Sequence, residues 1–323
     1  MALSASSSLS LVDHLDVGAL AARLPLSPRT RFAPSPTGYL HLGHVVNALY
    51  VWGLTAHLNG RVLLRFETHD RIRSRADYVQ AITEDLDWLG FHADEGPVDQ
   101  GGDGRYARAL AGLAEAGHVY VCGCSRKDWA EPTEGAASQG IYDGRCRDRG
   151  LADGPGRSLR LRVQPGPEPF EDGRGALHRP EPVRVNGDII LRDRDGQWSY
   201  HLAVTVDDRD QGIDLVIRGE DLVDATGVQV QLARMLGRPR PPVFLHHALL
   251  MAEPGRKLSK SGRDSGVRDL RAAGASPAEV IGLAAYRAGL TATAGPVRAL
   301  DAAAIVGGSP GPGTARAQTR VLG

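Results

Sequence analysis

The chain has 323 residues, which is enough for one large or two ordinary domains around a substantial apolar core. Its 38 lysine and arginine residues balance 38 aspartate and glutamate residues, so any contact with nucleic acid must depend on local basic patches and not on a global positive field. No apolar run approaches the ~18 residues that suggest a membrane span, and the N-terminus lacks the basic opening of a secretory signal, so we expect a cytoplasmic protein with no membrane partner.

The beginning of the folded part is marked by a change in composition. Residues 1–28 are rich in serine, alanine and leucine and predict a poorly ordered extension or a short accessory helix. Residues 29–103 form the first half of the predicted fold. Here Arg31-Phe-Ala-Pro-Ser-Pro-Thr-Gly38 predicts a strand that ends in a rigid turn, because proline and glycine break regular structure. Apolar residues at helical spacing follow, and the first turn of that helix holds His41 and His44.

This strand, turn and helix predict a phosphate site. The free N–H groups and the positive dipole end of a helix attract anions. The imidazoles of His41 and His44 add directional donors at the same place. The alternative is that they are two solvent-facing histidines on an ordinary helix.

A second strand and helix indicate the fold class. Residues 61–67 predict a buried strand, and residues 77–88 predict a helix with apolar residues on one side. Alternating strands and one-sided helices indicate an α/β fold with a parallel sheet and right-handed crossovers. Ligands in such sheets bind outside the carboxyl ends of the strands. Glu67, at the end of the second strand, is therefore placed to reach a bound ammonium group.

Between residues 104 and 186 the periodicity weakens and glycine, proline and arginine become more frequent, which predicts an insertion. All cysteines of the chain lie in it, at positions 122, 124 and 146, and their crowding does not suggest a disulfide framework. Thiolates are the preferred structural ligands of Zn²⁺, which takes four ligands, so Tyr142 or a histidine such as His118 must complete a site. The alternative is small buried cysteines in a reduced cytosol.

The second half of the fold, residues 187–256, again shows regular patterns. One of its predicted strands ends at Arg218. The predicted strands cover 187–192, 198–206, 213–217 and 243–250, and a helix is predicted from Asp221 to Leu236.

A loop near the C-terminus concentrates lysine. The chain has three lysines, and two of them, Lys257 and Lys260, lie in Arg256-Lys-Leu-Ser-Lys-Ser-Gly262. Lysine is a compact point charge on a flexible stem, which suits a phosphate that moves during a reaction. We interpret the loop as a mobile phosphate clamp, and the alternative is an ordinary basic surface loop.

The C-terminal region divides into two parts. Residues 257–290 combine the lysine loop with Ser276-Pro-Ala-Glu279, a capping-box pattern that opens a helix. Residues 291–323, rich in alanine, glycine, proline and threonine, predict a flexible tail.

Two of these motifs resemble a known family. His41-Leu-Gly-His44 and the lysine loop resemble the HIGH and KMSKS signatures of class I aminoacyl-tRNA synthetases. The words around them, Arg31–Gly38 and Ile217-Arg-Gly-Glu-Asp221, resemble the glutamyl branch, and the match covers most of the chain. The resemblance implies an α/β fold with a Rossmann-like parallel sheet, a zinc-containing insertion subdomain that binds the acceptor, and a short C-terminal helical segment.

The resemblance also implies the site residues. The spacing Cys-x-Cys and Tyr-x-x-x-Cys is similar to the zinc site of the glutamyl-queuosine tRNA(Asp) synthetases, which favours Tyr142 as the fourth ligand. The family's Glu-Asp-x-Asp word reads Glu67-Thr-His-Asp70 here, so it assigns no role to Thr68 or His69. The implied residues are Arg31, Ala33, Ser35, Glu67, Tyr200 and Arg218 for glutamate; His41, Gly43, His44, Lys257, Ser259 and Lys260 for ATP; and Cys122, Cys124, Tyr142 and Cys146 for Zn²⁺, with His41, His44, Lys257 and Lys260 catalytic.

Glutamate presents two carboxylates, and the implied pocket offers two arginines, Arg31 and Arg218. Because a guanidinium group pairs strongly with a carboxylate through two parallel hydrogen bonds, one arginine for each carboxylate is a sensible division. The sequence does not decide which arginine takes which carboxylate.

The expected reaction joins L-glutamate to ATP, accompanied by Mg²⁺, as glutamyl-adenylate. Few residues follow the lysine loop, so the chain is expected to lack a separate anticodon-binding domain, as the glutamyl-queuosine enzymes do. The implied acceptor is therefore queuosine in the anticodon loop of tRNA(Asp), and the enzyme is expected to be a monomer. The alternatives are a minimal synthetase that charges a tRNA 3′ end, an adenylating ligase that uses no RNA, and a non-catalytic RNA-binding module.

Overall fold

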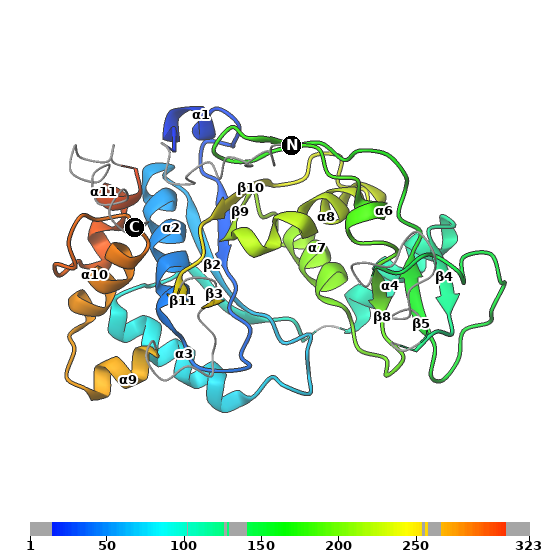
Figure 1. Cartoon of the computed structure of the whole chain (residues 1–323), viewed down its shortest axis with the longest axis horizontal. Coiled ribbons are helices and arrows are strands. Elements are labelled where there is room, and N and C mark those ends of the chain that lie inside the picture. The colour runs from blue at the N-terminus through cyan, green and yellow to red at the C-terminus, as the bar shows by residue number, and fades with distance from the viewer. Residues whose placement is uncertain are drawn as a thin grey trace, which may run out of the picture.

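The computed structural model describes residues 15–101, 103–125, 128, 141–253, 256–257 and 266–307. Its centre is a five-stranded sheet in the order β10-β9-β1-β2-β3, and every pairing in it is parallel (Figure 1). The predicted α/β class with a parallel sheet is therefore confirmed. The strands are β1 (Arg29–Phe32), β2 (Arg61–Phe66), β3 (Glu95–Asp99), β9 (Leu215–Gly219) and β10 (Val243–His247).

The sheet joins the two halves of the sequence. β1 pairs with β2 on one side and with β9 on the other, where Thr30 lies opposite Leu215. The carboxyl ends of β1, β2 and β9 therefore lie next to one another, although the whole insertion separates β3 from β9 along the chain. The strands predicted at 61–67, 213–217 and 243–250 are confirmed.

Helix α2 (Leu42–His57) lies between the central sheet and the C-terminal helices. It packs against the sheet on one side and against the helices α10 (Pro277–Arg287) and α11 (Ala302–Val306) on the other (Figure 1). Most of its circumference is apolar and buried, as expected for a helix covered on two sides. The helix predicted behind the capping box is also confirmed, because Ser276 Oγ accepts a hydrogen bond from the Glu279 backbone N–H.

The C-terminal region corrects one prediction. The flexible tail predicted at 291–323 is wrong for its first part, because the 3₁₀ turn η3 (Ala299–Asp301) and α11 follow α10. Ala302 is buried against α2 at Gly53, where an added Cβ would come within 2.7 Å of the Ala302 carbonyl oxygen. The burial of Ala302 depends on Gly53, which is far away in the sequence, so the amphipathic pattern of the residues around Ala302 does not predict it. The residues after 307 lie outside the described part of the chain.

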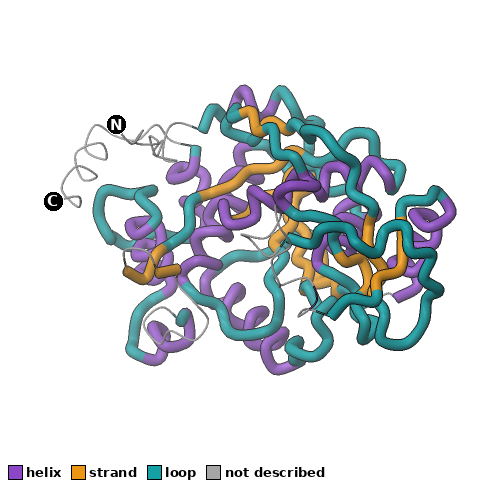
Figure 2. Tube along the Cα trace, turned by 45° about the vertical axis from the view of Figure 1, so that its right-hand side comes forward, coloured by secondary structure: helices purple, strands orange, loops and turns teal. Residues whose placement is uncertain are grey.

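The insertion builds a second, smaller unit with loops along much of its length (Figure 2). Its antiparallel sheet takes its last strand, β8, from residues predicted to begin the second half of the fold. A core shared with helices α7 (Tyr200–Asp210) and α8 (Val223–Met235) attaches this unit to the rest of the molecule. Its elements are α4 (Asp103–Glu115), β4 (Val119–Cys122), β5 (Ser158–Leu161), β6 (Phe170–Glu171), β7 (Leu177–His178), α6 (Pro182–Val185) and β8 (Ile190–Arg192).

A second prediction, a strand at residues 198–206, is corrected, because residues 200–206 form the beginning of α7. The run Leu202–Val206 is buried on all sides, and a continuous apolar run does not distinguish a buried helix from a buried strand. Ser199 carries the missed signal, because its side chain caps the helix by accepting a hydrogen bond from the Leu202 N–H.

The remaining elements lie around these two units. The helices predicted at 77–88 and from Asp221 to Leu236 are confirmed, and the described part of the N-terminal region, from residue 15 on, contains one short helix. None of the described helices is both long and apolar enough to cross a membrane. The remaining elements are α1 (Val17–Ala21), α3 (Ala76–Leu89), η1 (Glu220–Leu222), β11 (Met251–Glu253), β12 (Arg256–Lys257) and α9 (Val267–Ala272).

Candidate active site

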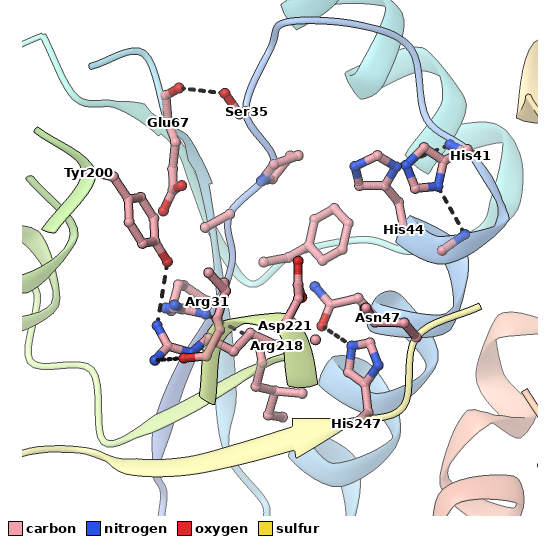
Figure 3. Close-up of a pocket in the computed structure, with 18 of the residues that line it drawn as sticks. Arg31, Ser35, His41, His44, Asn47, Glu67, Tyr200, Arg218, Asp221 and His247 are labelled. Carbon is pink, nitrogen blue, oxygen red and sulfur yellow. Dashed lines mark hydrogen bonds between the residues drawn. The ribbon is translucent and has the colours of Figure 1, made fainter. Parts of the chain in front are cut away.

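A pocket of about 790 Å³ opens at the carboxyl ends of β1, β2 and β9, beside the first turn of α2 (Figure 3). The predicted glutamate and ATP residues whose side chains are described all line it, although they come from both halves of the sequence. The side chains of Lys257, Ser259 and Lys260 lie outside the described part of the structure. The predicted residues in the pocket wall are Arg31, Ala33, Ser35, His41, Gly43, His44, Glu67, Tyr200 and Arg218.

The two histidines at the start of α2 cap the helix reciprocally. His41 Nδ1 accepts a hydrogen bond from the Gly43 N–H at 3.1 Å, and His44 Nδ1 accepts one from the His41 N–H at 3.1 Å. A backbone N–H can only donate, so both Nδ1 atoms are acceptors and both neutral rings carry their hydrogen on Nε2. The rings lie 3.9 Å apart (Figure 3), so two N–H donors stand beside the positive end of the helix.

Arg218, at the end of β9, is a buried cation held by neutral groups. Its side chain is 5% exposed, and among the described residues no carboxylate lies within ion-pair distance of it. Burial lowers the pKa of Arg218, because a charged group is less stable away from water. The acceptors around the guanidinium are Gln229 Oε1 at 2.7 Å, Thr226 Oγ1 at 2.8 Å, the Leu222 carbonyl oxygen at 3.2 Å, His246 Nε2 at 3.3 Å and Tyr200 Oη at 3.4 Å.

A buried histidine orients this arginine, and the sequence-based prediction missed it. Asp172, between β6 and β7, accepts hydrogen bonds from the backbone N–H of His246 at 3.0 Å and from its Nδ1 at 2.7 Å. His246 Nε2 is therefore an acceptor that faces Arg218. Burial lowers the pKa of His246, which keeps its ring neutral and avoids a second cation beside Arg218. The signal for this residue was a pair of histidines, His246 and His247, at the end of a buried strand.

Arg31, in contrast, already has an anionic partner. Its Nε lies 3.2 Å from Asp208 Oδ1, and the same oxygen accepts from Arg65 Nη1 at 2.8 Å. Arg65 also pairs with Glu67, whose carboxylate lies 3.4 Å from its Nη2. Burial alone would raise the pKa of Asp208, but the adjacent guanidinium groups lower it below its ordinary value. Of the two arginines expected to bind glutamate, Arg31 thus has a carboxylate partner and Arg218 has none among the described residues.

The cysteines gather in the insertion, away from this pocket. The sulfur atoms of Cys122, Cys124 and Cys146 all lie within 4.8 Å of one another, and this group includes no histidine. Sulfur atoms bound at about 2.3 Å to a tetrahedral Zn²⁺ lie roughly 3.8 Å apart, so the cluster fits a zinc site. Tyr142 Oη lies 3.4 Å from Cys122 Sγ and accepts a hydrogen bond from the Cys146 N–H at 3.0 Å. Its oxygen is therefore next to the thiols.

Comparison with known proteins gives a consistent picture. The family model of class I tRNA synthetases of the E and Q type, catalytic domain, matches residues 28–294. A glutamyl-Q tRNA(Asp) synthetase of Rhodobacter capsulatus is 41% identical over 273 residues, which cover 78% of this chain and 97% of that protein. One from Symbiobacterium thermophilum is 39% identical over 288 residues, which cover 83% of this chain and 88% of that protein.

Solved structures show the same similarity. A glutamate tRNA ligase from Elizabethkingia meningosepticum, crystallised in complex with its amino acid, superimposes with a TM-score of 0.67 at 25% identity. The superposition covers 80% of this chain and 60% of that one. A glutamate-tRNA synthetase from Elizabethkingia anophelis gives a TM-score of 0.64 at 25% identity, with 80% and 61% of the two chains covered.

Proposed function

Because the chain belongs to the class I tRNA synthetases of the glutamate and glutamine type, we propose that it activates L-glutamate with ATP and transfers the glutamyl group to queuosine at the wobble position of tRNA(Asp). The observation that carries the proposal is Arg218, a buried guanidinium without a carboxylate partner among the described residues, in a pocket that also holds Glu67. A buried cation of this kind is stabilised when a substrate carboxylate becomes its counter-ion.

The pocket offers a partner for each charged group of glutamate. Arg218 pairs with one substrate carboxylate. Glu67, which also forms an ion pair with Arg65, accepts a hydrogen bond from the substrate ammonium group. Arg31 contributes a weaker positive field to the other carboxylate, because Asp208 already neutralises it in part. Arg218 is therefore the main carboxylate ligand in this proposal.

ATP binds beside α2 in this proposal. The Nε2–H groups of His41 and His44 donate hydrogen bonds to phosphate oxygens at the helix N-terminus. Because Gly43 has no side chain, the backbone of this turn lies close to the phosphates. Lys257 and Lys260, with Ser259, close over the pyrophosphate. Mg²⁺ supplies charge neutralisation to the phosphates when it is bound.

Activation is then an in-line displacement. An oxygen of the glutamate α-carboxylate attacks the α-phosphorus of ATP, and pyrophosphate leaves with the electron pair of the broken P–O bond. The protein supplies position and positive charge and no nucleophile of its own. The enzyme acts as a cytoplasmic monomer in this proposal.

Zn²⁺ belongs to the same proposal as a structural ion. Cys122, Cys124 and Cys146 hold it as thiolates, and Tyr142 provides the fourth ligand. A metal bound by four protein ligands contributes folding free energy and leaves no open position for chemistry.

We expect purified protein to contain about one zinc per chain and Cys146→Ser to lose most of it, together with a lower Tm, because one thiolate is gone. Tyr142→Phe keeps all three sulfur atoms and is expected to retain more zinc than Cys146→Ser. Elemental analysis after dialysis against a mild chelator, with thermal unfolding of the same samples, measures both effects. Carefully prepared wild-type protein with far less than one zinc per chain contradicts the site.

The acceptor is tested with matched RNAs. Labelled glutamate and ATP are incubated without RNA, with tRNA(Asp) that carries queuosine, and with tRNA(Asp) that carries guanine at the wobble position. We expect label only on the queuosine-containing tRNA, and nuclease digestion should locate it in the anticodon loop and not at the 3′ end. Label on both tRNAs selects 3′-end charging, and a labelled product without RNA selects a small-molecule ligase.

A further inference from the structure

His69 is a histidine of the pocket to which the family resemblance assigned no role. It follows β2 and lines the pocket, and Gln100, directly after β3, contacts it twice. Gln100 Oε1 lies 3.1 Å from the His69 backbone nitrogen and 2.9 Å from its Nδ1. The amide nitrogen of Gln100 points the other way and donates to Asp207 Oδ2 at 2.8 Å.

These contacts determine where the hydrogen of the ring lies. The backbone N–H of His69 can only donate, so the Gln100 atom that it meets must be the carbonyl oxygen. That oxygen cannot donate, so Nδ1 of His69 carries the hydrogen. In the neutral ring Nε2 is then an unprotonated acceptor. Among the described residues none forms a hydrogen bond with this atom.

The pocket therefore holds imidazoles of two kinds. His41 and His44 present Nε2–H donors beside α2, whereas His69 presents an Nε2 lone pair. The ring of His69 lies 5.9 Å from that of Tyr200, whose hydroxyl contacts Arg218. The ring of His69 is thus on the amino-acid side of the pocket.

The same residues connect His69 to the insertion. Asp207, behind Gln100, accepts a hydrogen bond from Tyr106 Oη at 2.9 Å and pairs with Arg105 Nε at 3.0 Å. Both residues lie on α4, the first helix of the insertion. A group that handles the acceptor is expected at this junction, since the family resemblance implies that the insertion binds the acceptor.

We propose that His69 Nε2 accepts the proton of the acceptor hydroxyl during transfer, a role that rests on the proposed function. The hydroxyl oxygen forms a bond to the carbonyl carbon of glutamyl-adenylate while its O–H bond breaks toward Nε2. The bond from that carbon to the phosphate oxygen breaks, and AMP leaves with the electron pair. The imidazolium then returns its proton to water, which leaves the glutamyl ester and neutral His69.

Other groups near His69 are less suited to this role. Glu67 is paired with Arg65, and Asp70 is paired with Arg73 on the same loop as His69. Burial raises the pKa of Tyr200, so its phenol stays protonated. Asp207 lies behind Gln100 and is already bonded to α4, and Arg218 is a cation.

The test separates activation from transfer in single turnovers. His69→Gln keeps a polar side chain but removes the base, and exposed His92→Gln is the matched control. We expect transfer from preformed adenylate to queuosine-containing tRNA(Asp) to fall roughly 10²- to 10³-fold in His69→Gln, with pyrophosphate exchange falling at least tenfold less. The wild-type transfer rate should drop in acid, because a protonated base cannot accept the hydroxyl proton, and the variant should lose this dependence.

Each outcome bears on the proposal. Equal loss of exchange and transfer, unchanged transfer, or a variant that keeps the wild-type pH dependence overturns the role of His69 and leaves the proposed function intact. Wild-type protein that forms adenylate but transfers to no tRNA overturns the proposed function and this role together. Gln100→Leu provides a second variant. Without the Gln100 oxygen, nothing holds the hydrogen of the His69 ring on Nδ1, so Nε2 is unprotonated in only part of the molecules. We expect a smaller loss of transfer, with the pH dependence retained.

Discussion

Replacing Arg218 with glutamine should lower kcat/KM for glutamate in ATP–pyrophosphate exchange by roughly 10²- to 10⁴-fold. The substitution leaves a substrate carboxylate buried without its cation, and breaking a buried pair in this way costs about 3–5 kcal/mol. The folded protein should tolerate the change unusually well. Arg218 is held by neutral acceptors, so its removal leaves no carboxylate among the described residues without a cationic partner. Tm should therefore stay equal or rise.

The measurement is initial exchange rates over a range of glutamate concentrations, with thermal unfolding of the same preparations. Arg218→Lys is the informative companion, because it keeps the charge but loses the planar fork that meets Gln229 and Thr226 together. It should recover only part of the activity. Wild-type values of kcat/KM for Arg218→Gln would show that Arg218 is not the carboxylate ligand.

Asp208→Asn should have the opposite effect, a large loss of stability. Asp208 is the common partner of Arg31 and Arg65, and the side chain of Arg65 is fully buried. Removing one member of a buried charge network costs about 3–5 kcal/mol, because the remaining cations are left without compensation. We expect a clearly lower Tm and denaturation midpoint at neutral pH.

The pH dependence follows from the lowered pKa of Asp208. A carboxyl group whose pKa is lower in the folded state stabilises the protein above its unfolded value of about 4, and this contribution is lost as pH falls through the folded value. The difference between wild type and Asp208→Asn should therefore shrink in acid. Asp210→Asn, on the same helix and paired with Arg209 near the surface, is the control and should change stability by less than about 1 kcal/mol. Equal losses in the two variants would contradict the network.

The sequence predicts well those parts of the site that depend on short motifs of neighbouring residues. The turn at Arg31–Gly38 and the first turn of α2 follow from proline, glycine and the spacing of apolar residues, and the structure has β1 and α2 there. The carboxyl end of β2 follows in the same way, so the fold class itself places Glu67 at the pocket, whereas Arg218 was assigned to it by the family resemblance.

The residues that orient these groups have no local signature. Asp172 and His246 are 74 positions apart, and Arg65 and Asp208 are 143 apart, so each pair exists only once the insertion and α7 are packed. The error at α7 has the same origin, because a helix buried on all sides loses the one-sided pattern that identifies helices. The docking of α11 on Gly53 is likewise a tertiary contact.

The placement of β9 beside β1 also affects how the protein is made. Thr30 in β1 pairs with Leu215 in β9, 185 positions later in the chain. At about 5–20 residues per second, the ribosome needs roughly 10 to 40 s to synthesise the chain between them. During that time the nascent first half exposes a strand edge that could pair with the wrong chain. That edge is closed when β9 pairs with β1, and the pocket is complete only after translation has passed Arg218.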